Sequence, residues 1–168
     1  MVDNNIAQEA EFHGILFTRL QDYIHSNATE FELPVAEKTV DSGRAVIFIP
    51  NPLNGDLVIE VKRDDVYPRD REVIRQARNY ADDLGTEFFA TCNSNDLFLF
   101  KYSDEIKISQ IEFIYFNLRN KKLSKVVNKL LSDIEYVHKK GKLPVQQERE
   151  RIVGVLRSFH SSNWPTYE

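Results

Sequence analysis

The sequence predicts an α/β (α+β) fold, with a mixed central sheet flanked by helices and a helical extension at the C-terminus. Two observations carry this prediction: residues 45–62 have the pattern of a β-hairpin, and amphipathic helix patterns lie on both sides of it. A third is a pair of apolar runs at 86–91 and 97–102, separated by a loop of turn formers. Together they indicate layers of helix packed on one sheet.

The composition is that of an ordinary globular protein. The chain has 168 residues, of which 42% are hydrophobic and 29% charged, so one domain is the simplest expectation. No apolar run approaches about 18 residues and no signal-peptide pattern is present, so we expect no membrane association. The single Cys92 favours a cytoplasmic protein. The net charge of −4 argues against a dominant electrostatic hold on nucleic acid but leaves room for a local basic groove.

The hairpin consists of two runs rich in Val, Ile, Leu and Phe, joined by a segment of Asn, Pro and Gly. Its turn is expected to centre on Leu53. Antiparallel counting from there gives the facing pairs Phe48 with Val58, Val46 with Glu60, and Arg44 with Lys62.

The remaining elements follow from periodicity and from turn or cap residues. Residues 31–40 are expected to be extended, and Pro34 favours an edge or bulged position. Gly85 is suited to end a helix over 69–84. Further helices are expected over 7–25, 121–139 and 146–160, strands over 86–91 and 97–102, and either state over 108–116.

Polar residues interrupt this apolar framework at a few positions. Glu60 and Lys62 are two residues apart on a strand, so they point to the same face, and charges beside a core are costly unless they are paired or bind a ligand. Gln76 and Tyr80 are one helical turn apart and can act on a common point. Glu9 falls within the apolar stripe of the first helix, although a first-turn glutamate is usually solvated.

In order, the stretches GRAVIF, LVIEVKRD, QARNYA and GTEFFATCNSNDLFLF resemble the PD-(D/E)XK nuclease superfamily. The sequence is most similar to the N-terminal nuclease domain of type I restriction enzyme motor subunits and of related single-chain restriction enzymes. The resemblance covers about residues 7–102. It implies a restriction-endonuclease-like fold. Because the sequence changes character after Asp104, we expect a nuclease-like core over 1–104 and a helical extension over 105–168. The uncapped, aromatic end SSNWPTYE favours further modules of a longer chain.

The resemblance also implies a reaction, Mg²⁺-dependent hydrolysis of DNA phosphodiesters in a restriction-modification enzyme, with Mn²⁺ as a possible substitute. Glu60 would bind the metal, with the main-chain carbonyl of Val61 as a further ligand. Lys62 would orient the attacking water or stabilise developing charge. Gln76 and Tyr80 match residues that border the site in part of the family. Glu9 is the candidate counterpart of a first-helix acid.

One position departs from the family pattern. The family expects an acid on the first hairpin strand, facing the ExK glutamate, and Val46 stands there. Asp41, Asp64, Asp65 and Glu9 are the conceivable replacements, and the sequence selects none of them. Two functions therefore stay open, an active Mg²⁺-dependent endonuclease domain and an inactive nuclease fold that contacts DNA or serves as a scaffold.

Plainer interpretations exist for the same residues. Glu60 and Lys62 can form an ordinary ion pair at a strand end, and Arg44 can pair with Glu60 across the hairpin. The four histidines are scattered without zinc-ligand spacing. A lysine-rich stretch is either a solvated helix face or a phosphate contact; its members are Lys121, Lys122, Lys125, Lys129, Lys139, Lys140 and Lys142.

Overall fold

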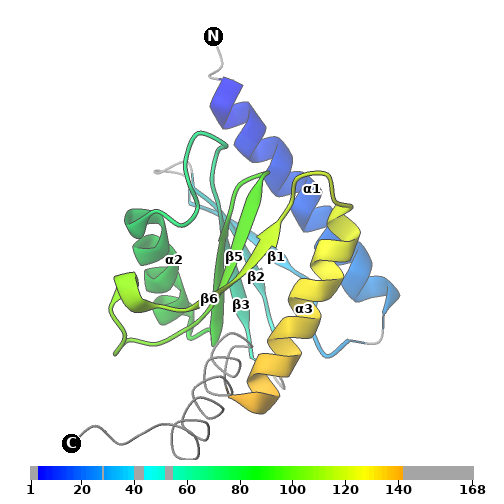
Figure 1. Cartoon of the computed structure of the whole chain (residues 1–168). Coiled ribbons are helices and arrows are strands. Elements are labelled where there is room, and N and C mark those ends of the chain that lie inside the picture. Colours follow the sequence, from blue (N-terminus) through cyan, green and yellow to red (C-terminus); the bar gives the residue numbers. More distant parts are fainter. Residues whose placement is uncertain (1–3, 28, 40–43, 52–54, 142–168) are drawn as a thin grey trace, which may run out of the picture.

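The structure is a computed structural model that describes residues 4–27, 29–39, 44–51 and 55–141. The elements in chain order are α1 (Asn4–Ser26), β1 (Val35–Thr39), β2 (Arg44–Ile49), β3 (Leu57–Val61), α2 (Arg71–Leu84), β4 (Phe88–Cys92), β5 (Asp96–Lys101), the 3₁₀ turn η1 (Ile108–Gln110), β6 (Phe113–Asn117) and α3 (Leu123–Lys140). A central sheet has α2 on one face and α1 and α3 on the other, as Figure 1 shows. Among the described residues, no helix is long and apolar enough to cross a membrane.

The sheet has six strands in the order β1-β2-β3-β4-β5-β6, which is also their order along the chain. All neighbouring pairs are antiparallel except β3 with β4, which are parallel. Parallel neighbours need a long crossover connection, and α2 provides it. The predicted mixed sheet flanked by helices is confirmed, and β1, with its preceding Pro34, is an edge strand as expected.

The hairpin has the predicted register. Val46 faces Glu60 and Phe48 faces Val58. The described β2–β3 pairs end at Ala45 with Val61, one step short of the expected pairing of Arg44 with Lys62.

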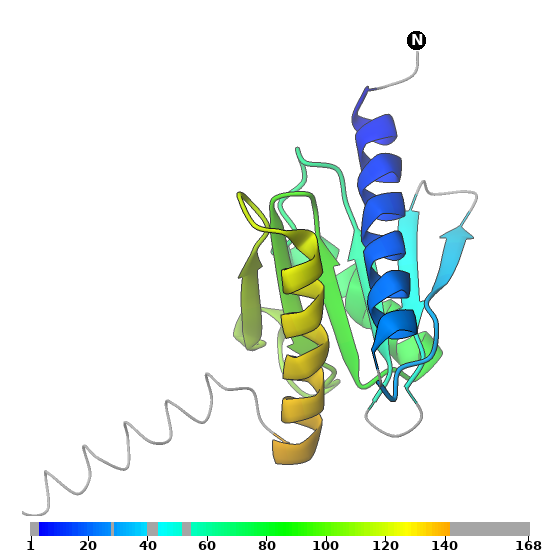
Figure 2. The ribbon, with the colours of Figure 1, turned by 90° about the vertical axis from the view of Figure 1, so that its right-hand side faces the viewer.

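Two hydrophobic cores lie on opposite faces of the sheet. The larger one joins the sheet to α1 and α3, which lie side by side across it in Figure 2, and it includes Leu20, Ile59 and Leu130. The smaller one joins the sheet to α2 and includes Val46, Val58 and Ile74. Alternate residues of β3 therefore enter different cores, which explains why the strand is apolar on both sides.

The helix α2 begins at Arg71, two residues after the expected start. It ends as predicted, because Gly85 has a φ of 68° in the left-handed region and its N–H donates to the carbonyls of Ala81 and Asp82. A β-carbon is disfavoured in this conformation, so glycine suits the position. The C-terminal end of α2 is thereby fixed directly before β4.

The expected division at residue 104 does not coincide with the sheet. The ambiguous segment 108–116 forms η1 and most of β6, and β6 pairs with β5. In turn, α3 packs against α1 and supplies much of the larger core. Residues up to Gly141 therefore share one sheet and one set of cores with the N-terminal part. The helix expected over 146–160 lies outside the described residues.

Candidate active site

Glu60 is a buried carboxylate in the middle of an apolar strand. It is the fourth residue of β3, only 1% exposed, and its neighbours Ile59 and Val61 are buried as well. Its facing residues on the two adjacent strands are Val46 on β2 and Thr91 on β4. A charge in such surroundings is costly unless a partner compensates it.

Lys62 provides that compensation. Its Nζ lies 3.0 Å from Oε1 of Glu60 and donates a hydrogen bond of 3.2 Å to Oε1 of Gln76 on α2. The lysine side chain is 16% exposed, so the ammonium is partly shielded from solvent. The structure thus brings together three of the predicted residues, Glu60, Lys62 and Gln76.

Glu9 joins the same cluster from α1. Its carboxylate accepts a hydrogen bond from the backbone N–H of Arg63 and is close enough to Lys62 and Glu60 for both charges to affect its pKa. The residue is 9% exposed. The alternative in which Glu9 is a solvated first-turn residue is therefore wrong, and its place in the apolar stripe of α1 is the better guide.

Burial is the main reason why the pKa of Glu9 is raised above its ordinary value of 4.5. The negative charge of Glu60 raises it further, whereas Lys62 and the N–H and charge of Arg63 oppose the shift. The folded protein therefore holds a proton on Glu9 at a pH where the unfolded chain has lost it. Stability should fall as the pH rises from about 4.5 through the pKa of the folded state.

We expect Glu9→Gln to raise the free energy of unfolding near pH 7 in metal-free protein, because the variant has no carboxylate to desolvate. The difference from the wild type should shrink as the pH falls through the pKa of the folded state toward about 4.5, and should then stay constant. Urea unfolding at several pH values measures it, with the exposed Glu11→Gln as the control. A loss of stability that is the same at every pH would contradict the expectation.

Two of the other acids considered at the facing position, Asp64 and Asp65, have partners outside the cluster. Val46 faces Glu60, as predicted, and is itself 1% exposed. Asp64 accepts hydrogen bonds from the N–H and hydroxyl of Ser94 at 3.0 and 2.6 Å, and Asp65 pairs with Arg63 at 2.9 Å. Asp41 lies outside the described residues. Among the replacements that lie in the described part of the chain, Glu9 is the one whose pKa is affected by Glu60 and Lys62.

Three further expectations concern Tyr80, Arg44 and the ion pair of Glu60 with Lys62. Tyr80 is one turn beyond Gln76 on α2, and its half-buried ring packs against the smaller core. The pairing of Arg44 with Glu60 concerns a side chain outside the described part of the structure. The ion pair of Glu60 with Lys62 exists, but Glu60 lies in the interior, not at a solvated strand end.

The donor set of this cluster is small. Among the described residues, no group of three or more His, Cys, Asp or Glu side chains is arranged to bind a metal ion. Two carboxylates, Glu9 and Glu60, lie near the end of β3, where the Val61 carbonyl is also found. Mg²⁺ is commonly bound through one or two carboxylates together with phosphate oxygens and water, so this set fits a metal that is shared with a phosphate ligand.

Thr91 is a site residue that the sequence did not reveal. It faces Glu60 across the β3–β4 pair, is fully buried, and its hydroxyl has no hydrogen-bond partner among the described residues. Buried hydroxyls normally have a partner. Only the register of β3 with β4 places Thr91 opposite Glu60. This register depends on pairing between distant segments, so the local sequence does not show it.

We expect Thr91→Val to leave the thermal stability unchanged or slightly higher, because it replaces an unpaired buried hydroxyl with a methyl group of similar size. Differential scanning calorimetry measures this, and Thr91→Ala, which leaves a cavity, is the comparison. If valine destabilises the protein as much as alanine does, the hydroxyl has a structural partner and the expectation fails.

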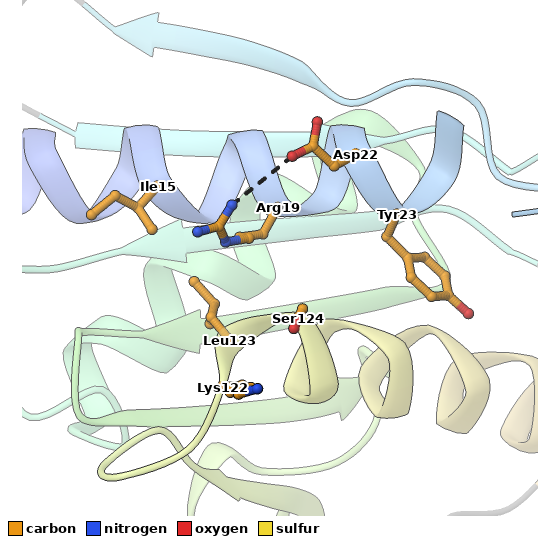
Figure 3. Close-up of a pocket in the computed structure, with 7 residues that line it drawn as sticks. All are labelled: Ile15, Arg19, Asp22, Tyr23, Lys122, Leu123 and Ser124. Carbon is orange, nitrogen blue, oxygen red and sulfur yellow. Dashed lines mark ion pairs between the residues drawn. The ribbon is translucent and has the colours of Figure 1, made fainter. Parts of the chain in front are cut away.

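A groove of about 520 Å³ lies on the other face of the molecule, between α1 and α3. Figure 3 shows its lining, which includes Ile15 and Tyr23 from α1 and Leu123 from α3, with an ion pair between Arg19 and Asp22 at 4.0 Å. None of its lining residues belongs to the Glu60 cluster.

The sequence matches no known family profile and no curated protein. The structure is similar to the crystal structure of the type IIG restriction endonuclease BpuSI, with a TM-score of 0.57 and 17% sequence identity over 91% of this chain. The chain spans about a fifth of the length of that enzyme, since the match covers 20% of it. The fold is therefore restriction-endonuclease-like, as the sequence predicts.

Proposed function

We propose that this chain is a Mg²⁺-dependent DNA endonuclease domain of the PD-(D/E)XK type, working within a larger restriction-type enzyme. The observation that carries the proposal is the cluster formed by the buried Glu60, the Lys62 paired with it, Gln76 and Glu9. Its likeness in fold to a type IIG restriction endonuclease supports the same reaction class. The other modules of such an enzyme would select the target and move along DNA.

The metal would be held by Glu60, Glu9 and the Val61 carbonyl. A bound divalent cation polarises a phosphodiester and lowers the pKa of a coordinated water. The burial that raises the pKa of Glu9 fits this role, because a bound cation would offset the cost of desolvating its carboxylate. Mn²⁺, which also prefers oxygen ligands, should substitute for Mg²⁺.

Lys62 would serve as the positively charged group of the site. Its ammonium is fixed by two contacts, to Glu60 and Gln76, so its position is set before substrate binds. A preorganised cation stabilises the negative charge that develops on the phosphate and can orient the attacking water. Gln76 acts as a positioning residue in this scheme, and Tyr80 borders the site from the same helix.

Incubation with supercoiled plasmid DNA and Mg²⁺ or Mn²⁺ tests this function. We expect nicked or linear products from the wild-type chain or its parent enzyme, and none from Glu60→Gln, which preserves the size of the side chain but removes its charge. Glu135→Gln on α3 is the control and should cut normally. No cleavage by the wild type, or equal cleavage by Glu60→Gln, would exclude the proposal.

A second function is favoured by the position of Val46. The residue facing Glu60 is apolar, where the resemblance implies a second acid, and the loss of that acid is expected of a nuclease fold that no longer hydrolyses DNA. Such a chain would contact DNA or act as a scaffold. Titration calorimetry with Mn²⁺ separates the two functions, because measurable binding that is lost in Glu60→Gln contradicts the inactive alternative.

A further inference from the structure

The row of residues that contains Glu60 continues across the sheet to an exposed aromatic side chain. Glu60 faces Thr91, Thr91 faces Phe98, and Phe98 faces Tyr115. Facing residues have their side chains on the same side of a sheet. At about 4.8 Å per strand, Tyr115 lies roughly 14 Å from Glu60 on that side, and it is 46% exposed.

A second exposed ring reaches the same place from the loop that follows Lys62. Tyr67 is 55% exposed and packs edge-on against Phe98, with the ring centroids 5.8 Å apart. Tyr115 stacks on Phe98, with the ring centroids 5.0 Å apart. The loop is anchored, because the amide of Asn93 donates to the carbonyl of Val66 at 3.0 Å. Two solvent-exposed tyrosines are thus braced by one buried phenylalanine.

Arginine side chains border these rings. The guanidinium of Arg69 lies 4.3 Å above the ring of Phe113, which packs edge-on against Phe98 at 5.3 Å. Arg119 forms two hydrogen bonds with the buried Asp96, at 2.9 and 3.1 Å, so its charge is offset there. We call Tyr67, Phe98, Phe113 and Tyr115, with Arg69, the aromatic surface.

The chemistry of this surface favours nucleotide bases as its ligand. Proteins that bind single-stranded nucleic acid combine a basic groove along the backbone with aromatic side chains on which the bases stack, and arginine adds cation–π contacts. The chain is acidic overall, with a net charge of −4, and next to the aromatic surface the charge of Asp96 offsets that of Arg119. Phosphate attraction to an intact duplex is therefore weak here, whereas stacking remains available.

We propose that the aromatic surface binds unpaired bases of a DNA strand whose phosphodiester lies at Glu60. The inference rests on the proposed function for the position of that phosphodiester. The separation of roughly 14 Å corresponds to about four base steps of stacked DNA. The bound strand would run along the loop from Lys62 to Tyr67, placing the unpaired bases a few nucleotides from the cleaved bond.

Fluorescence anisotropy without divalent metal tests the binding separately from cleavage. The 168-residue chain is titrated into a labelled single strand of about 12 nucleotides and, in parallel, into a blunt duplex. We expect Tyr67→Ala and Tyr115→Ala each to weaken single-strand binding about tenfold, with little effect on the duplex. Tyr67→Phe, which keeps the ring, should bind like the wild type.

Tyr136→Ala is the matched control, because Tyr136 is 40% exposed but belongs to α3, which packs on the opposite face of the sheet. Circular dichroism melting checks that the variants are folded. The inference is overturned if the wild type does not bind the single strand, or if folded alanine variants bind it as well as the wild type. Equal loss of duplex binding would also overturn it. The inference also fails if the alanine variants change only the association with another protein module.

Glu60→Gln distinguishes this inference from the proposed function. The variant should lose cleavage, while its binding of the single strand should still be weakened about tenfold by Tyr67→Ala or Tyr115→Ala. If the wild type does not cleave but tyrosine-dependent binding is present, the proposed reaction fails and the binding surface stands. If the wild type cleaves and the alanine variants bind and cut normally, the reaction stands and the aromatic surface has no role in it.

Discussion

Replacing Lys62 with methionine is expected to abolish DNA cleavage and to lower the free energy of unfolding by about 3 kcal/mol. Methionine keeps much of the length of the side chain but removes the ammonium that lies 3.0 Å from Glu60. Glu60 is 1% exposed, so its carboxylate would lose its cation without gaining solvent. Urea unfolding and plasmid cleavage measure the two effects.

A second variant separates the two effects of Lys62→Met. In Glu60→Gln/Lys62→Met the carboxylate of Glu60 is removed together with its cation, so stability should return toward that of the wild type while cleavage stays absent. Lys129→Met is the matched control, because Lys129 pairs with Asp133 at 2.8 Å on the exposed face of α3. It should cost less than about 0.5 kcal/mol and leave cleavage intact. Equal destabilisation by the two lysine variants would show that Glu60 does not depend on Lys62.

Local patterns in the sequence were sufficient to predict most of the helices and strands and the register of the hairpin. Hairpin counting gave the pairing of Val46 with Glu60, because turn residues and alternation fix register over a short loop. The glycine after α2 marked the end of that helix. The segment 108–116 was not assigned, since a short apolar run fits either a strand or a helix, and its state depends on pairing with β5.

The candidate site was predictable only in part, for a related reason. Two-residue spacing placed Glu60 and Lys62 on one face, whereas the contact of Lys62 with Gln76 depends on how α2 crosses the sheet. The approach of Glu9 depends on the packing of α1, and the position of Thr91 depends on the parallel register of β3 and β4. Such contacts join segments that are distant in sequence, so no local pattern records them.

Val46→Asp introduces an acid at the position that faces Glu60, where the nuclease superfamily that the sequence resembles has one. In metal-free protein near pH 7 we expect the free energy of unfolding to fall by about 3 kcal/mol or more, because a second carboxylate would be buried facing Glu60. Burial and the like charge raise the pKa of such an aspartate in the folded state. The loss should therefore be smaller at acid pH, where the new side chain is protonated, and should grow as the pH rises.

Divalent metal should reverse much of this loss if the cluster binds cations. Mn²⁺ bound between the new aspartate and Glu60 stabilises the folded state by mass action, so the melting temperature of Val46→Asp should rise with Mn²⁺ concentration more steeply than that of the wild type. Cleavage should increase in parallel. Val46→Asn is the control, since it has the same size and a buried polar group but no charge to attract the metal. If the aspartate and asparagine variants respond equally to Mn²⁺, the facing position does not belong to a metal site, and the function without hydrolysis gains support.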